Sequence, residues 1–231
     1  MSRKDEFKNE NPNPAKRFLD WKSDNKCFSY YDKEKEERIE VPLPFKFLVL
    51  KEMQTVKGWN DASESAIYSN EVKYLSTEEL NVRSFKGGEI AKGLYKDIRS
   101  KVIDAGGHYV KSIYIMTEDN EIWNLQLKGS AVSEWGEFTK KSKSRLFDEW
   151  VEVTEAEERK KGSIKYSVPV FMYNTSLTEA EGNKADEVYK ILEVYMNAYL
   201  DAKTIDQDDK TIEEAEALIN QEFPVEDDLP F

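Results

Sequence analysis

The first half of the chain alternates apolar and polar residues over short stretches, which is typical of β-strands. The most apolar stretch, residues 41–56, predicts a core strand. Pro42 and Pro44 confine its start to an edge or a bulge, because proline cannot donate a ladder hydrogen bond. Polar residues at 58–65 predict a loop that carries Trp59. The other strands predicted here are two within 18–31, around a turn at Asp24-Asn25, and one each at 66–72 and 80–85.

The middle of the chain predicts an amphipathic helix. Ile90, Leu94, Ile98 and Val102 are spaced by four residues, and a pair of glycines on either side would bound the helix. Alternation then resumes, which predicts a return to strands. The other elements predicted in the second half are strands at 109–116, 121–128, 147–153 and 164–173, turns at 119–120 and 155–162, and a short helix at 130–141.

Residues 178–200 give the clearest helix of the sequence. Thr178 and Glu181 match a capping box, in which two side chains satisfy backbone N–H groups at a helix start. The apolar face predicted for this helix comprises Val188, Ile191, Leu192, Tyr195 and Tyr199. Many short strands with a mid-chain helix and a C-terminal helix predict a mainly β, α+β fold, such as a small antiparallel β-barrel.

Charge is distributed unevenly along the 231 residues, which have a net charge of −12. Residues 201–231 hold eleven acidic and two basic residues, a net charge of −9, whereas residues 80–147 carry a net charge of +4. This asymmetry distinguishes the chain from a uniformly acidic protein. We therefore predict a flexible arm at 1–14, one domain at 15–200, and a disordered acidic tail at 201–231.

The composition excludes several classes of protein. Hydrophobic residues make up 39% of the chain and charged residues 35%, and no apolar run approaches the roughly 20 residues that span a bilayer. No apolar leader with a basic start opens the sequence. A single cysteine, Cys27, excludes a disulfide framework. Together these features predict a cytoplasmic protein.

Few residues could serve catalysis or bind a metal. The single histidine, His108, excludes zinc sites rich in histidine. Residues 88–93 have the glycine spacing of a phosphate-binding loop, but Leu94-Tyr95 follow where Lys and Ser or Thr are needed. We therefore expect no catalytic residue, no metal and no cofactor, and a protein that is not an enzyme. A magnesium-dependent nuclease stays open as an alternative, because a carboxylate site needs no fixed spacing.

The last nine residues, 223–231, carry the most specific signal. Three acids precede an apolar residue, a proline and a phenylalanine, and this ending resembles the acidic tip of bacterial and phage single-stranded DNA-binding proteins. Leu229 stands where the best-known bacterial version has isoleucine. Length, central positive charge and aromatic content make the body similar to the divergent single-stranded DNA-binding proteins of bacteriophages.

The resemblance implies an OB-like barrel that coats and protects single-stranded DNA without sequence preference. Its tip would recruit proteins of replication, repair or recombination, with Phe231 as a hydrophobic anchor. The partner-binding residues it implies are Glu226, Asp227, Asp228, Leu229, Pro230 and Phe231. The tail could also compete with DNA for the basic part of the protein. An adaptor that binds replication proteins without binding DNA is the other alternative.

Single-strand binders combine cations for phosphates with aromatic faces for bases, and the sequence interleaves the two types. Arg83 and Lys86 favour phosphate contact, and Trp59 in its polar loop favours stacking. Trp123 alternates with Leu125 and Leu127, which favours a core position. The candidate DNA-binding residues are Trp21, Lys22, Tyr30, Tyr31, Lys57, Trp59, Arg83, Phe85, Lys86, Lys92, Trp123, Lys128, Trp135, Lys140 and Lys141.

Overall fold

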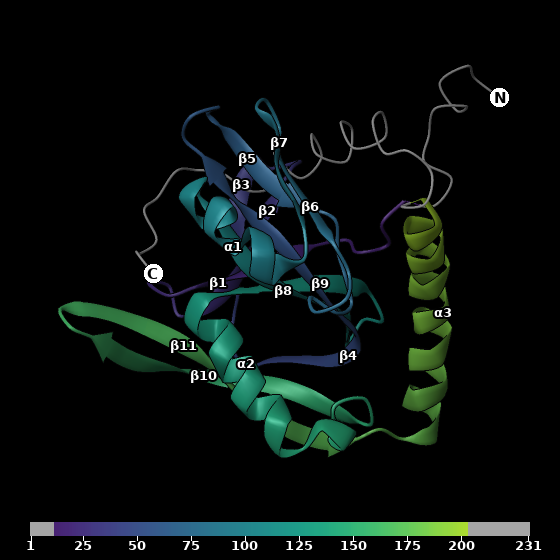
Figure 1. Cartoon of the computed structure of the whole chain (residues 1–231). Coiled ribbons are helices and arrows are strands. Elements are labelled where there is room, and N and C mark those ends of the chain that lie inside the picture. The colour runs from purple at the N-terminus through teal and green to yellow at the C-terminus, as the bar shows by residue number, and fades with distance from the viewer. Residues whose placement is uncertain (1–11, 203–231) are drawn as a thin grey trace.

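The computed structural model describes residues 12–202, which form a mainly β fold around one mixed sheet (Figure 1). Its helices are α1 (Tyr95–Asp104), α2 (Gly129–Lys141) and α3 (Glu179–Ala202), with a short 3-10 helix, η2, at Lys143–Arg145. Its strands are β1 (Phe18–Lys22), β2 (Cys27–Asp32), β3 (Glu37–Val41), β4 (Phe45–Asn60), β5 (Ser65–Ser69), β6 (Leu80–Ser84), β7 (Gly88–Gly93), β8 (Gly107–Thr117), β9 (Ile122–Lys128), β10 (Glu149–Lys161) and β11 (Ile164–Ser176).

The sheet is open. Its strand order is β3-β2-β1-β9-β8-β4-β5-β6-β7, while β10 pairs with β4 and with β11. All of these pairs are antiparallel except β1 with β9, which is parallel. Because β5, β6 and β7 extend the sheet away from β3, the ends of this path do not meet. The mainly β class is therefore confirmed, and the expectation of a closed antiparallel barrel is wrong.

The longest strand of the sheet, β4, belongs to three pairings. Its first residues pair with β10, its middle with β8 and its last residues with β5. A register shift between Val49 and Lys51 bends it, as a β-bulge does. The predicted strand at 41–56 is confirmed from Phe45 onward, and Pro42 and Pro44 lie in the connection between β3 and β4.

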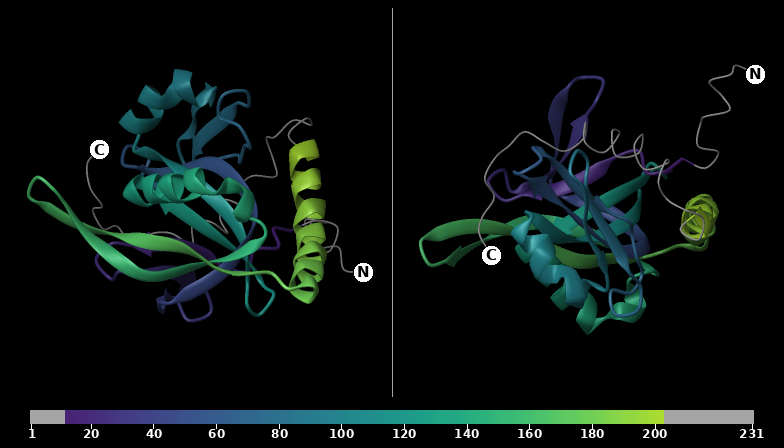
Figure 2. Two further views of the ribbon diagram at one scale, coloured as in Figure 1. Left: turned by 90° about the horizontal axis from the view of Figure 1, so that it is seen from below. Right: turned by 45° about the horizontal axis from the view of Figure 1, so that its top comes forward.

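Helices cover both faces of the sheet (Figure 2). On one face, α2 packs through Trp135 and Ala131 against residues of β1, β2, β4, β8, β9 and β10, and α1 packs on β4 to β7. On the other face, α3 packs against the start of β4, the end of β8 and the start of β9. The β10–β11 hairpin extends beyond the rest of the described residues, on the side opposite α3, in both views of Figure 2.

Local patterns predicted several elements correctly. The hairpins within 18–32 and 107–128, the helix at 129–141 and the long terminal helix are all present. The capping box is also formed: Thr178 N donates to Glu181 Oε2 over 2.8 Å, and Glu181 N donates to Thr178 Oγ1 over 3.3 Å. The predicted apolar face is correct for Val188, Leu192 and Tyr195, which are buried. Ile191 is 59% exposed and lies outside that face.

Three boundaries are wrong. Residues 88–93 form β7, so the mid-chain helix starts only at Tyr95; Ile90 belongs to a strand paired with β6. The segment is a strand because it pairs with β6, although the spacing of its apolar residues fits a helix. Trp59 lies in β4 and not in a loop, because β4 runs on to Asn60 and pairs with β5. The predicted turn at 155–162 is the long arm of the β10–β11 hairpin, which turns only after Lys161.

Candidate nucleic-acid interface

Alternation along the strands places five basic residues on one face of the sheet. In β9, Leu125 and Leu127 point into the core under α2, so Asn124, Gln126 and Lys128 point to the opposite face. Residues that are paired across neighbouring strands share a face, and this rule follows the register from β9 to β1, β2, β3, β8, β4, β5 and β6. The residues assembled in this way, here called the basic face, are Lys22, Arg38, Lys57, Arg83 and Lys128.

A carboxylate lies among these cations. Asp20 Oδ1 is 3.3 Å from Lys128 Nζ, and Asp20 Oδ2 is 3.8 Å from Arg38 Nη1. Burial alone would raise the pKa of Asp20, but the charges of Lys128, Lys57, Lys22 and Arg38 hold that pKa below its ordinary value. Asp20 is therefore ionised at neutral pH. It orders cations from several strands while neutralising only one charge.

Aromatic side chains lie on the same face. Tyr31 is paired with Arg38, and Tyr68 is paired with both Lys57 and Arg83. Trp59 follows Lys57 by two residues in β4 and so shares its face. The Phe18 ring lies 5.6 Å from Lys57 Nζ. All four aromatic residues are half-buried. Cations and rings thus alternate over strands that are far apart in the sequence, as single-strand binding requires.

The basic face also carries a histidine, and further candidate residues lie at its edge. His108 is paired with Lys57 across β8 and β4, and burial together with the nearby Lys128 charge lowers its pKa. The imidazole is therefore neutral near pH 7. Lys92, in the outer strand β7, is paired with Asn81 and lies on the same face at its edge. Phe85 and Lys86 lie in the turn that joins β6 to β7, at the end of that part of the sheet.

Four of the aromatic candidates belong to the core instead. Trp135 is 2% exposed and Tyr30 is 8% exposed. Trp21 and Trp123 pack against the same cluster; Trp21 Nε1 donates to the Ser167 carbonyl over 3.0 Å, and Trp123 Nε1 donates to Glu121 Oε2 over 3.0 Å. The structure therefore corrects their expected role as stacking residues. Tyr30, Trp21 and Trp123 point to the side of the sheet that α2 covers, and Trp135 belongs to α2 itself.

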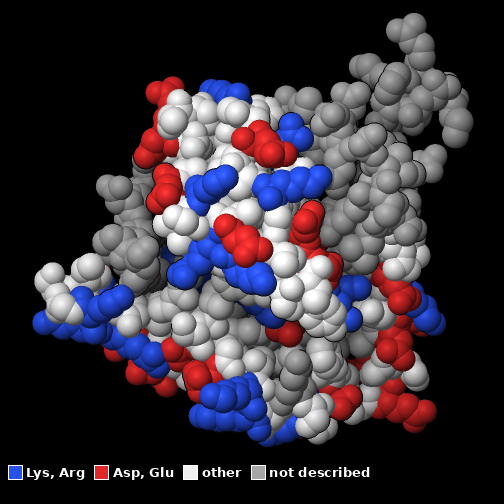
Figure 3. All heavy atoms as spheres, in the orientation of Figure 1, with Lys and Arg blue, Asp and Glu red and all other residues white. Residues whose placement is uncertain are grey.

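Lys140 and Lys141 are also separate from the basic face. Both lie at the end of α2. Lys140 is exposed, and its Nζ lies 3.9 Å from Glu137 Oε1. Figure 3 shows the face of the molecule that bears α1 and α2, where blue and red residues are interspersed except for a blue group at its lower end. The sequence places these lysines among aromatic residues, but α2 positions them on the other side of the sheet.

Sequence reasoning missed Phe18, Arg38 and Tyr68. The strands of Phe18 and Tyr68 were predicted, but β3, which holds Arg38, was not. The register that brings the three residues beside Lys57 and Arg83 joins segments up to about a hundred residues apart, and no local pattern encodes it. The candidate partner-binding residues 226–231 lie outside the residues that the structure describes.

Residues 12–202 contain no group of three or more His, Cys, Asp or Glu side chains placed to hold a metal ion. Over the same range, no helix combines the length and the apolar character needed to cross a bilayer. Comparisons with protein families, with curated proteins and with solved structures give no match for this chain.

Proposed function

We propose that the protein binds single-stranded DNA on the basic face, without being an enzyme. One observation carries the proposal: Lys22, Arg38, Lys57, Arg83 and Lys128 come from five different strands and gather on one face with four half-buried aromatic side chains. Cations spaced along a surface suit a phosphate backbone, and rings between them suit unpaired bases. Duplex DNA would present its phosphates but not its base faces.

The connectivity of the central strands supports an OB-like arrangement within the open sheet. β4 pairs with β8, β8 pairs with β9, α2 follows β9, and β10 then pairs with β4 and with β11. This order resembles that of the OB-fold, a five-stranded, partly open Greek-key barrel whose second and third strands bind oligonucleotides. The corresponding strands here are β8 and β9, and Lys128 belongs to β9.

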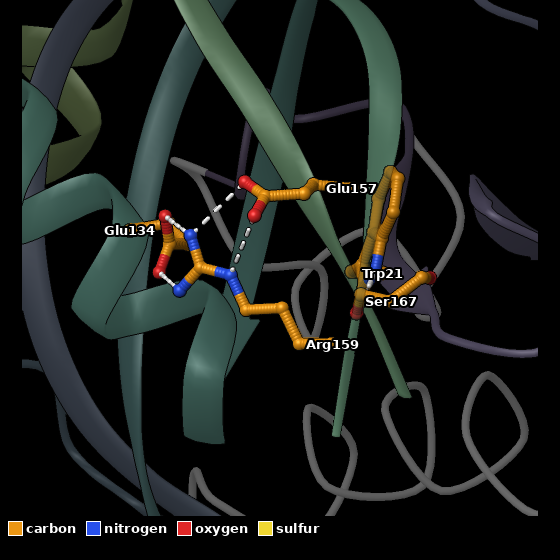
Figure 4. A network of polar contacts seen from close by, with 5 residues as sticks. All are labelled: Trp21, Glu134, Glu157, Arg159 and Ser167. Atoms are coloured by element: carbon orange, nitrogen blue, oxygen red, sulfur yellow. Dashed lines mark hydrogen bonds and ion pairs between the residues drawn. The ribbon is translucent and has the colours of Figure 1, made fainter. Parts of the chain in front are cut away.

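The β10–β11 hairpin supports the same function. Two sets of contacts hold the hairpin a few residues before its turn (Figure 4): Arg159 Nη2 donates to Glu134 Oε2 of α2 over 2.9 Å, and Trp21 Nε1 of β1 donates to the Ser167 carbonyl. Beyond these anchors the tip is basic. Lys160 is paired directly with Lys165, a like-charge pair that an adjacent polyanion would relieve.

The acidic tail carries the second part of the proposal. We propose that residues 226–231 bind replication, repair or recombination proteins, with Phe231 as the anchor and the acids attracted to a basic surface. Deletion of residues 201–231 should raise single-strand affinity or leave it unchanged, because nine negative charges are removed, and should abolish partner binding. A fall in DNA affinity would contradict this division of roles.

The deciding experiment compares two variants of equal charge change. Lys22→Ala/Lys128→Ala removes cations from the basic face, and Lys140→Ala/Lys141→Ala removes two from the end of α2. Affinity for a fluorescent oligothymidine is measured by anisotropy over a salt series, with the matching duplex as competitor. Log affinity should fall with log salt for the unaltered protein. The slope should weaken by about 0.7 for each phosphate that the protein no longer neutralises, so by about 1.4 for the first variant.

The second variant should keep the original slope. Equal affinity for duplex and single strand, no dependence on salt, or equal effects of both variants would overturn the proposal. Cleavage of a labelled strand in the presence of magnesium would favour the nuclease alternative. If the protein binds replication proteins but does not bind DNA, the adaptor alternative would be favoured.

A further inference from the structure

A row of small and polar side chains crosses the middle of the basic face. Ser29 of β2, Asp20 of β1, Gln126 of β9 and Ser112 of β8 are successive register partners. Ser29, Gln126 and Ser112 are each 2% exposed or less. Asn124 lies beside this row, two residues before Gln126, and is fully buried. The same face is apolar at the end of β8 and the start of β9, where α3 covers it.

Several of these polar groups lack hydrogen-bond partners. Asn124 Nδ2 donates to Ser112 Oγ over 2.8 Å, but Asn124 Oδ1 and Gln126 Oε1 are buried without a hydrogen bond from any described residue. Asp20 Oδ1 is already ion-paired with Lys128 Nζ. Asn81 Oδ1, which also lacks a hydrogen-bond partner among the described residues, lies on the same face in β6. Buried polar groups are normally paired, and each unpaired group destabilises the fold. Their gathering on one face indicates a ligand that supplies donors.

We propose that Gln126 and Asn124 contact base edges and favour bases that carry an exocyclic amino group. The proposal rests on the proposed function, because the surrounding cations must first hold the strand across the row. Cytosine presents an amino group where thymine presents a carbonyl oxygen and a methyl group. The unpaired amide oxygens accept hydrogen bonds from such amino groups, whereas they repel the thymine carbonyl, and Asn124 Nδ2 is held by Ser112. Stacking on the aromatic residues cannot make this distinction, because all bases have a π-face.

Homopolymers test the proposal without any substitution. Oligodeoxycytidine, oligodeoxyuridine and oligothymidine of equal length are compared at one salt concentration. Cytidine strands should bind about fivefold or more tightly than the other two, the effect of one well-formed base contact. Deoxyuridine lacks the thymine methyl group and should behave like thymidine. Equal affinities for all three would overturn the proposal, and so would a deoxyuridine strand that binds like deoxycytidine.

A matched pair of variants adds a second readout. Gln126→Met replaces the unpaired amide by an apolar side chain of similar length, and Gln54→Met makes the same change on the opposite face, where Gln54 bonds to Tyr109 and Lys73. Gln126→Met should abolish the cytidine preference and should leave the urea midpoint equal or higher. Gln54→Met should keep the preference and lower the midpoint.

Two results for Gln126→Met would contradict the assignment. A retained preference would place base recognition elsewhere, and a lowered urea midpoint would mean that the amide is already satisfied within the fold. Failure of this inference is distinguishable from failure of the proposed function. Salt-dependent single-strand binding that ignores base identity would remove only the base-edge contact. Absence of single-strand binding, or indifference to Lys22→Ala/Lys128→Ala, would remove both.

Discussion

Trp135 and Trp59 should respond in opposite ways to replacement by alanine. Trp135 is 2% exposed, its Nε1 donates to Glu52 Oε1 over 2.7 Å, and its ring centroid is 5.0 Å from that of Phe171. A buried tryptophan removes roughly 200 Å² from water, which at about 25 cal/mol per Å² is worth about 5 kcal/mol. Trp135→Ala should therefore lower the free energy of unfolding by about 4 kcal/mol, within the range for such truncations.

Trp59 lies half-buried on the basic face, two residues after Lys57. If its ring stacks on a base, Trp59→Ala should weaken single-strand binding by about 1–3 kcal/mol, roughly five- to 150-fold. Its effect on stability should be smaller than that of Trp135→Ala, because less of the side chain is buried. Trp135→Ala should leave the affinity of the folded fraction unchanged.

Urea unfolding followed by far-ultraviolet circular dichroism measures the stability of both variants. With a slope of about 2 kcal/mol per molar urea, the midpoint of Trp135→Ala should fall by about 2 M. Anisotropy titrations in the absence of urea measure affinity. A midpoint shift below about 0.5 M for Trp135→Ala, or unchanged DNA affinity for Trp59→Ala, would refute the assignment of one ring to the core and the other to the interface.

Three further substitutions test single features. Gly58→Ala should destabilise the fold by about 2 kcal/mol or more in urea unfolding, because a Cβ atom there would lie 2.2 Å from the Gly106 carbonyl oxygen, and an unchanged midpoint would contradict that packing. Thr178→Ala should lose the capping box with Glu181 and cost about 1 kcal/mol by the same measurement, whereas Thr178→Ser should not. Partial burial and a neighbouring lysine charge lower the pKa of His108, and bound phosphate would raise it again, so single-strand affinity should increase as the pH falls from about 7 to about 5. His108→Gln should flatten this pH profile, and an unaltered profile would place the proton uptake elsewhere.

The sequence predicted those elements whose signals are local. Thr178 and Glu181 mark a helix start because the two residues satisfy each other's backbone groups. Strand 88–93 has no comparable signal: the spacing of Ile90 and Leu94 fits a helix, but pairing with β6 decides the segment. A local pattern states which residues alternate. It does not state which partner strand will select between two conformations.

The candidate interface was also predictable from the sequence only in its local features. Of the basic residues named from the sequence, Lys57, Arg83 and Lys128 lie on one face. The sequence could not tell which of the two faces of each strand would be covered by α2. Both faces of β1 and β2 carry aromatic residues, so Tyr30 and Tyr31 are equivalent by pattern, yet Tyr30 is buried in the core while Tyr31 is not.

Strand β4 supplies side chains to each of the three hydrophobic clusters of the described residues: Phe47 to the first, Leu48 to the second and Val56 to the third. A shared strand couples the free energies of the clusters, since loosening its backbone weakens all three together. We therefore expect a single cooperative unfolding step, with the amides of the middle of β4 exchanging most slowly with solvent. We expect a cut between β7 and α1 to leave two fragments that do not fold alone, so the basic face would be regained only when both are present.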